Sequence, residues 1–471
     1  MRLRPDFPFR RLALVLSGGG AMGAYEIGVL RVLESLGVRP AVISGVSVGA
    51  INALLWVTNG FRTQPLVEIW SRLRPSGIGM RWATLAIRAG GMLLVTFALL
   101  EVILTLAGSP EVGALRWLRG GVAGRGDASS PVPDILAWIT IGVLGGIAAS
   151  LSRPVEGWIA RLAPASDPAR WHRWVGRILL VAGLAHVLTL ATGLPWPHRF
   201  SATALLVLAG VWLLNRSGRT GQWMRGLLIR LLPETGGRGL WGGAARRRLL
   251  ERVADPAELH RLTDGSVRLI FSALAVDNGR ICYFINWPDP SPALRRLADE
   301  SLGEIQVLRD ADEMLQAVVA SSALPLVFEP VRLRGREFLD GGVFNDQPLR
   351  VVMGEEADAA IVVLLNPSRS LEGTPRVPNL FDLGSRLFEI LNWRGLQGEL
   401  QAIPADWSQR PPDGAPVKMC VVEPERTLPG GLLGVDPANA ADLMRLGEAD
   451  ALRALARAGW LDEASPAPAP A

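Results

Sequence analysis

Two short apolar runs near the N-terminus, each followed by glycines and then by a helical segment, constrain the fold of this chain more than any other feature. The first run, Leu12 to Leu16, ends at three consecutive glycines, residues 18–20. The second run, Ala41 to Ile43, enters the pentapeptide of residues 45–49, and residues 48–58 then continue as a helix-like segment. Runs that are apolar throughout are typical of strands buried on both faces of a parallel sheet. We therefore expect an α/β fold with a mainly parallel central sheet.

The pentapeptide Gly45-Val46-Ser47-Val48-Gly49 fits a nucleophile elbow. In such an elbow a tight turn between strand and helix lifts a serine hydroxyl clear of the sheet, and small flanking residues relieve the crowding. The pattern alone is weak evidence, because glycine makes up 52 of the 471 residues. Its position between an apolar run and a helix is the stronger indication. It makes Ser47 the candidate nucleophile, with Gly45 and Gly49 as its flanking glycines.

The first glycine loop has two interpretations. Gly18, Gly20 and Gly23 match G-x-G-x-x-G, the dinucleotide fingerprint, which requires an acidic residue about 20 positions further on. This chain has Ser44 and Gly45 at that place, so the dinucleotide interpretation fails. In acyl transfer the same loop has a direct use, because backbone N–H groups at a helix N-terminus can converge on an oxyanion.

A hydrophobic block at residues 81–232 separates the N-terminal motifs from the rest of the chain. Its four apolar runs cover residues 89–108, 135–151, 178–194 and 200–214, and the chain as a whole has a mean hydropathy of +0.26. A membrane span needs about 20 apolar residues to cross roughly 30 Å of hydrocarbon. Gly142 and Gly146 form a small-xxx-small pair that favours close helix packing. We predict an α-helical transmembrane insertion; a soluble lid that covers the active site is the alternative.

Arginines cluster at residues 72–88, 153–173 and 216–230, on both flanks and in the middle of the block. The positive-inside rule then places both flanks on the cytoplasmic side. We predict a multi-pass protein of a bacterial inner membrane with a cytoplasmic catalytic domain. The net charge is +5, but the arginines are scattered and not interleaved with aromatic residues, so we expect no nucleic-acid partner.

The two cysteines, Cys282 and Cys420, are too few and too far apart for a disulfide framework or a metal site. We therefore expect a reducing compartment, no metal and no cofactor. The sequence does not indicate an oligomeric state.

A serine nucleophile needs a base, and histidine is a poor candidate here. The four histidines, His172, His186, His198 and His260, all precede the acidic residues of the last two hundred positions, so none of those acids can stand between Ser47 and a histidine in the order Ser, acid, His. A carboxylate acting directly on the serine is the remaining simple choice. Asp340 is the candidate, because it stands where a predicted strand meets Gly341 and Gly342, although Asp-Gly-Gly is more often a plain turn.

Four motifs in one order resemble the patatin-like phospholipase family. They are the glycine loop 18–23, the elbow 45–49, the stretch Ala320–Pro330 and Asp340-Gly341-Gly342. The resemblance covers about residues 11–80 and 262–366. It implies a three-layer α/β fold and the hydrolysis of lipid acyl esters by a Ser-Asp dyad.

By matching positions, the resemblance makes Ser47 the nucleophile and Asp340 the base, and the N–H groups of Gly18, Gly19 and Gly20 the oxyanion hole. Two departures from the family pattern stand out. Met22 occupies a position where many members carry a basic residue, and the hydrophobic block is not part of the usual pattern.

Together these observations predict a membrane-associated serine lipid acyl hydrolase, phospholipase or lysophospholipase-like, which acts on membrane lipids through an acyl-enzyme. The alternative is a catalytically silent membrane-bound scaffold with the same fold. The predicted organisation is a first catalytic part at 1–80, the helical insertion at 81–232, a second catalytic part at 233–464 and a disordered tail at 465–471.

Overall fold

The computed structural model describes residues 2–4, 7–106, 132–151, 220–300, 303–343, 349–355, 357–369, 380–404, 407 and 416–462. The chain divides into two compact units. The sheet unit consists of residues 1–80 and 238–471, and the insertion unit consists of residues 81–237. Runs three and four of the hydrophobic block and the tail 465–471 lie outside the described residues.

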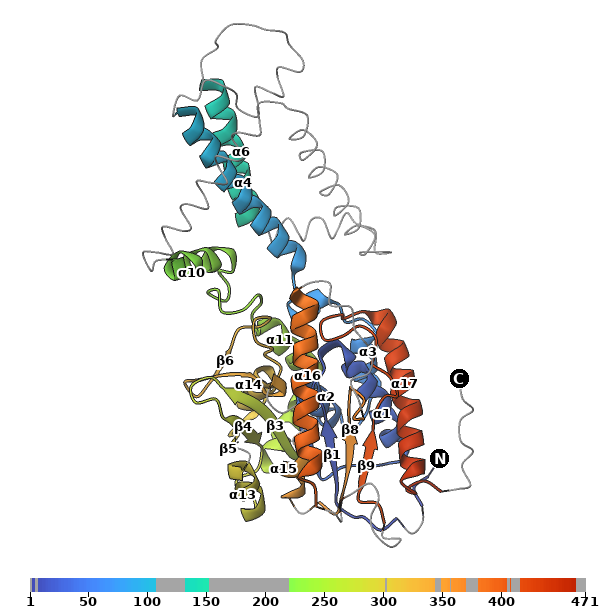
Figure 1. Ribbon diagram of the computed structural model, residues 1–471. Coiled ribbons are helices and arrows are strands. Elements are labelled where there is room, and N and C mark those ends of the chain that lie inside the picture. Colours follow the sequence, from blue (N-terminus) through green and yellow to red (C-terminus); the bar gives the residue numbers. More distant parts are fainter. Residues whose placement is uncertain are drawn as a thin grey trace. The chain divides into compact units, whose positions relative to one another are not determined.

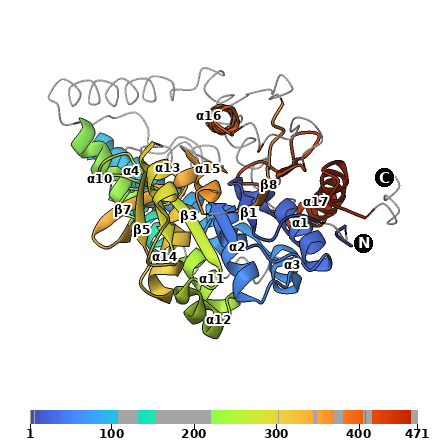
Figure 2. The ribbon, with the colours of Figure 1, turned by 90° about the horizontal axis from the view of Figure 1, so that it is seen from below.

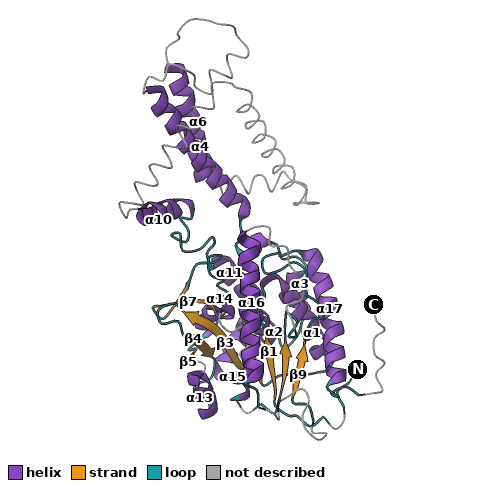
Figure 3. Cartoon of the chain, in the orientation of Figure 1, coloured by secondary structure: helices purple, strands orange, loops and turns teal. Residues whose placement is uncertain are grey.

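In the described part of the sheet unit, one nine-stranded sheet forms the centre, and its strands are orange in Figure 3. The main path runs β5-β4-β3-β2-β1-β8-β9, and β7 pairs with both β3 and β6. Five neighbouring pairs are parallel, whereas β4 and β7 run antiparallel to β3. The predicted α/β fold with a mainly parallel sheet is therefore confirmed. The strands are β1 Leu12–Leu16, β2 Val42–Val46, β3 Arg268–Ala275, β4 Ile281–Ile285, β5 Gly303–Val307, β6 Val331–Leu333, β7 Arg336–Asp340, β8 Ala359–Val363 and β9 Met419–Val422.

Helices cover both faces of this sheet, because successive residues of a strand point to opposite sides. In β1, Leu12, Leu14 and Leu16 pack into one core. Ala13 and Val15 pack into a second core on the other face. Figure 2 shows α16 on one side of β1 and β8, and α1 and α2 on the other. A strand buried on both faces must be apolar at every position, which is the pattern in the sequence.

Aspartate caps begin several of the helices around the sheet, and glycines allow two of these helices to pack closely. Asp255, Asp310 and Asp436 cap the N-termini of α12, α14 and α17 with their carboxylates. The α1–α17 contact needs two glycines, because a Cβ at Gly28 or Gly447 would lie 2.0 Å from a carbonyl oxygen of the other helix. The helices are α1 Ala24–Ser35, α2 Val48–Thr58, α3 Gln64–Trp70, α11 Ala244–Val253, α12 Pro256–Arg261, α13 Pro292–Glu300, α14 Ala311–Ser321, α15 Leu349–Met353, α16 Leu380–Gln401 and α17 Pro437–Arg457, with 3-10 turns η1 Gly20–Gly23, η2 Pro75–Ile78, η3 Leu262–Asp264 and η4 Gly341–Val343.

The insertion unit contains α4 Trp82–Leu106, α6 Val132–Ser150 and α10 Thr220–Leu231. Helices α4 and α6 lie side by side (Figure 1). Their closest approach is at Gly91 and Gly145, because a Cβ on Gly91 would lie 2.3 Å from the Gly145 carbonyl oxygen. The predicted pair Gly142 and Gly146 is less tightly packed, since a Cβ at these positions would lie 3.1 and 3.7 Å from its nearest neighbour.

Within the described residues, no helix combines the length and the apolar character that a membrane crossing needs. The prediction of transmembrane helices is therefore not supported by the described part of the insertion unit.

Candidate active site

Ser47 occupies the turn between the end of β2 and the start of α2. Its backbone adopts φ 54° and ψ −119°, a combination that side-chain-bearing residues rarely adopt. Such a conformation costs about 1–3 kcal/mol and persists only where the surroundings enforce it. Here the Ser47 N–H donates to the Ser321 hydroxyl over 3.0 Å. The strained turn carries the Ser47 side chain to the carboxyl edge of the parallel strands.

The two glycines of the elbow are required by close backbone packing. A Cβ on Gly45 would lie 2.7 Å from the backbone of Ala50, and a Cβ on Gly49 would lie 2.4 Å from the Leu16 carbonyl oxygen. Both distances are shorter than any real Cβ contact, so α2 can begin directly against β1 and β2 only with glycine at these positions. The strand extends through Val46, whereas the sequence had suggested that it stops before Gly45.

The tertiary structure brings Ser47 and Asp340 together. The Ser47 hydroxyl donates to Asp340 Oδ2 over 2.6 Å, and the two residues are 293 positions apart in the chain. Asp340 is the last residue of β7 and lies opposite Ala273 of β3. Its Oδ1 accepts from the Gly342 N–H over 2.8 Å, and its own N–H donates to the Ala323 carbonyl over 2.9 Å. Both oxygens of the carboxylate are therefore oriented by hydrogen bonds.

Burial controls the charge state of Asp340. The side chain is 2% exposed, and loss of hydration raises its pKa from 3.8 to about 6. Hydrogen bonds from Ser47 and Gly342 and the charge of Arg246 oppose this rise. Asp340 is thus ionised at pH 7, and its pKa is close enough to neutrality for both accepting and returning a proton.

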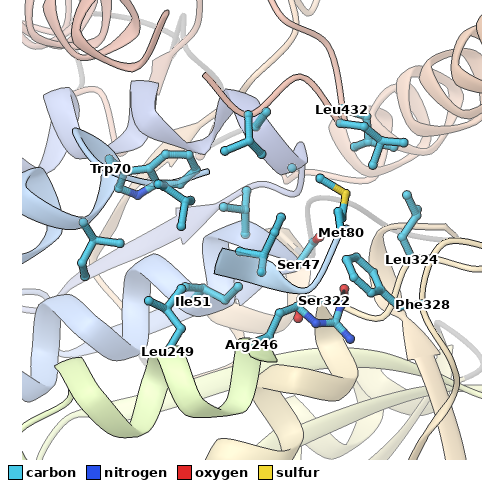
Figure 4. A pocket seen from close by; sticks show the side chains of 18 of the residues that line it. Ser47, Ile51, Trp70, Met80, Arg246, Leu249, Ser322, Leu324, Phe328 and Leu432 are labelled. Atoms are coloured by element: carbon cyan, nitrogen blue, oxygen red, sulfur yellow. Dashed lines mark hydrogen bonds between the residues drawn. The ribbon is translucent and has the colours of Figure 1, made fainter. Parts of the chain in front are cut away.

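A cavity of about 90 Å³ opens beside the Ser47 hydroxyl (Figure 4). Ser47, Asp340, Arg246 and Ser322 supply its polar side chains. The rest of the lining is apolar and comes mainly from α2, α3, η2 and the segment 432–435. These apolar residues include Ile51, Leu55, Leu66, Trp70, Met80 and Leu433. The cavity therefore suits an apolar group attached to a polar reacting centre.

The glycine loop borders the same cavity through Gly20 and Ala21. Gly20 has φ +56°, and a Cβ there would lie 2.0 Å from the Leu432 carbonyl oxygen, so only glycine fits. No described group accepts a hydrogen bond from the N–H of Gly18, Gly19 or Gly20. Of these three residues, Gly20 lines the cavity. Gly23 and Gly341 have packing roles, because a Cβ on Gly23 would lie 2.3 Å from the Val48 side chain and one on Gly341 2.5 Å from the Ser272 carbonyl.

Sequence reasoning missed two residues of the site. Ser321 supports the backbone of Ser47, and it stands at the end of α14 inside the stretch 320–330 that carries part of the family resemblance. Arg246 lies among three consecutive arginines, and only helical phase distinguishes it from Arg247 and Arg248. His260 is the one histidine in the described part of the chain, and it does not line the cavity.

Comparison with known proteins bears on the identity of this site. Residues 14–353 match the profile of the Patatin-like phospholipase family, which is more than half of the 471 residues. The chain belongs to the patatin-like phospholipase family. The predicted resemblance is confirmed, and patatin-like phospholipases are carboxylic ester hydrolases.

Individual patatin-like relatives match only short segments. The chain is 45% identical over 65 residues to "Lysophospholipase nte1" of Aspergillus terreus, which is 14% of this chain and 4% of that protein. It is 60% identical over 43 residues to "Triacylglycerol lipase 4" of Saccharomyces cerevisiae, which is 9% of this chain and 5% of that protein. The chain thus spans a small fraction of these relatives. Among solved structures, VipD from Legionella pneumophila aligns over 95% of this chain and 67% of its own, with 14% identity and a TM-score of 0.34.

Proposed function

We propose that this patatin-like protein is a membrane-associated serine lipid acyl hydrolase, phospholipase or lysophospholipase-like, with Ser47 as nucleophile and Asp340 as base. The observation that carries the proposal is the 2.6 Å hydrogen bond from the Ser47 hydroxyl to the Asp340 carboxylate on a strained elbow. A nucleophile and a base in direct contact form the minimal unit for covalent catalysis. No histidine relay is required.

The proposed reaction proceeds in two steps. Ser47 Oγ attacks the ester carbonyl carbon while Asp340 accepts the hydroxyl proton, and the developing oxyanion accepts hydrogen bonds from the N–H groups of Gly18, Gly19 and Gly20. Protonated Asp340 then gives its proton to the leaving alcohol, and the acyl-enzyme remains. In the second step Asp340 accepts a proton from water, the hydroxide attacks the acyl carbon, and the proton returns to Ser47 as the fatty acid leaves.

An acyl chain is the substrate part that the cavity suits. Its apolar lining from α2 and α3 would bury methylene groups, each worth about 0.8 kcal/mol. The likeness to a lysophospholipase and a triacylglycerol lipase supports a lipid ester as substrate. No metal or cofactor is needed for this chemistry.

The insertion unit is the part that we propose to contact lipid. On α4, Leu93 and Leu99 are 69% and 59% exposed, and on α6, Val143 and Leu144 are 55% and 59% exposed. Exposed apolar side chains on two packed helices favour a lipid environment, either as part of a multi-pass insertion with the catalytic domain cytoplasmic or as a surface anchor. Carbonate washing separates the two, because a spanning protein stays in the membrane pellet and a surface-bound protein is released.

Labelling with a fluorophosphonate tests the nucleophile. The wild type should form a covalent adduct, Ser47→Ala should form none, and Asp340→Asn should label far more slowly. Ser71→Ala, at an exposed serine, is the matched control and should label as the wild type does. His260→Asn should also label normally. Adduct formation on Ser47→Ala would refute the assignment, and a wild type that neither labels nor hydrolyses esters would favour the silent scaffold.

A further inference from the structure

A buried arginine lies beside the dyad and has no role in the mechanism above. Arg246 belongs to α11, is 3% exposed, and lines the cavity beside Ser47 (Figure 4). Asp340 lines the same cavity. Arginine is rarely buried to this extent unless it is paired. The glycine loop on another border of the cavity, residues 18–23, carries no charged side chain. Among the described residues that line the cavity, Arg246 is therefore the one with a positively charged side chain.

The contacts of Arg246 hold one segment of the site. Its Nη1 donates to the Ser322 carbonyl oxygen, and its guanidinium stacks on the ring of Phe328, 3.6 Å from Cζ to the centroid. Between these two residues runs the segment that supplies the Ala323 carbonyl, the acceptor for the Asp340 N–H. Ser321, the residue before Ser322, accepts a hydrogen bond from the Ser47 N–H through its hydroxyl. Arg246 thus anchors a segment that touches both members of the dyad.

The charge of Arg246 is not neutralised by an ion pair with any described carboxylate. Its Nε and Nη2 have no hydrogen-bond partner in the described part of the chain. The acidic groups that act on it are Asp340 and Glu329. In the other direction, Arg246 is the one charged group among the described residues that shifts the pKa of Asp340. Arg246 and Asp340 are therefore two buried charges of opposite sign that stabilise each other in a largely apolar surrounding, and Glu329 also acts on Arg246.

Several other charged side chains on the neighbouring elements form ion pairs with one another. On the β6–β7 hairpin, Glu337 pairs with Arg238 and Arg332, and Arg336 pairs with Asp277 and Glu304. On α14, Asp312 pairs with Arg247, and Glu313 pairs with Arg309 and Arg334. On α11, Arg247 also pairs with Glu251. Outside these pairs, Glu329 acts on Arg246, and Arg246 acts on the carboxylate of the dyad, whereas Arg248 and Arg252 of α11 are exposed.

We propose that Arg246 is a positioning residue of the dyad, whose contacts hold residues 321–328 against Ser47 and Asp340 and whose charge favours the ionised Asp340 carboxylate. This inference rests on the proposed function and deepens it. It assigns a role in the pH dependence of the site to a residue of α11 that touches neither the nucleophile nor the base by a hydrogen bond.

The inference predicts a specific change in pH dependence. Asp340 acts as a base only when ionised, so activity should rise with pH through its pKa of about 6. Without the neighbouring cation, the pKa of the buried carboxyl rises further. The low-pH limb of the activity profile should then move to higher pH. Arg246 itself stays charged at pH 7, because burial lowers its pKa only to about 9.

The test measures kcat/KM against pH from 5 to 9 with a water-soluble short-chain ester, using the full chain. Arg246→Met removes the charge and keeps an apolar stem, Arg246→Lys keeps the charge, and Arg248→Met is the control at an exposed arginine of the same helix. We expect Arg246→Met to lose activity several-fold at pH 6 and to recover much of this loss at pH 8.5. Arg246→Lys and Arg248→Met should keep the wild-type limb.

A uniform loss of activity at every pH in Arg246→Met would show that Arg246 has only a structural role, and an unchanged profile would show no role. If Arg246→Met does not fold, Arg246→Lys carries the test. This variant keeps the positive charge, so a shift of its low-pH activity limb relative to the wild type would overturn the proposal. A wild type without activity would instead refute the dyad itself, so the two failures are distinguishable.

Discussion

The sheet unit and the insertion unit use similarly apolar segments in opposite ways. Every residue of β1 and β2 is buried, and their side chains divide between two cores. In the insertion unit, α4 and α6 pack on each other but leave large apolar side chains such as Leu93 and Val143 exposed. An apolar run thus does not by itself determine whether the side chains form a core or a surface. The number of neighbouring elements decides whether apolar side chains are buried, and a central strand is buried because helices pack on both of its faces.

Both units also rely on glycine for close backbone contact, and the consequence differs. Gly49 lets α2 begin against the Leu16 carbonyl and so creates the strained turn at Ser47. Gly91 and Gly145 bring two helix backbones together and create no turn. The first contact produces the strained turn that presents the candidate nucleophile, whereas the second only joins two helices.

Among the variants that test this difference between the two units, Ser47→Ala should have the largest effect on activity. Ser47→Ala should lower kcat/KM for a soluble ester by about 10⁴-fold or more, since the nucleophile acts as a unit with its base. The fold should be retained, which circular dichroism can check. Retention of more than a few per cent of turnover in the purified variant would mean that the chemistry lies elsewhere.

Replacing Asp340 tests whether the buried carboxylate of the site lowers the stability of the sheet unit. The folded protein raises the pKa of this carboxyl from 3.8 to about 6, so its ionised form destabilises the fold by about 3 kcal/mol above pH 6. Because this cost is absent below pH 3.8, Asp340→Asn should be more stable than the wild type at pH 8, and the gain should shrink as the pH falls from 6 toward 4. Urea unfolding at several pH values measures this. A gain that does not vary with pH would contradict the assigned shift.

Gly91→Ala and Gly90→Ala compare two adjacent glycines of α4. A Cβ on Gly91 would lie 2.3 Å from the Gly145 carbonyl oxygen, whereas one on Gly90 would meet no atom within 4 Å. Gly91→Ala should loosen the α4–α6 contact by about 1–3 kcal/mol, and Gly90→Ala should stabilise α4 slightly. Hydrogen exchange of residues 82–106 and 132–150 reads out both. Equal exchange in the two variants would mean that α4 and α6 do not pack through Gly91.

The smallest effect concerns lipid binding. Leu93→Gln on α4 should weaken partitioning into phospholipid vesicles by about tenfold, as expected for one exposed apolar side chain. Leu446→Gln on α17 of the sheet unit, 44% exposed in the wild type, is the matched control and should leave partitioning unchanged. Cosedimentation with vesicles measures both. If Leu446→Gln had the larger effect, the lipid-binding surface would belong to the sheet unit.

Much of the local structure could be predicted from the sequence. The predicted strand Leu12–Leu16 and the predicted helix at residues 48–58 agree with β1 and α2 to the residue. Glycines mark the turns in both cases, and an apolar run between turn signals leaves little freedom in register. The close contact at Gly145 was missed, because Gly142, Gly145 and Gly146 look alike until the partner helix is in place.

By itself the sequence determined the α/β class and the candidates Ser47 and Asp340, because strand burial, elbow glycines and the shortage of histidines are local or compositional properties. Only the tertiary structure decided that the two side chains lie 2.6 Å apart, that Ser321 supports the elbow, and that Arg246 faces the cavity while Arg248 faces solvent. The physical reason is that a pKa, a strained backbone angle and the burial of a charge depend on neighbours from distant parts of the chain. Their positions arise only when the sheet brings β2, β7 and α11 together.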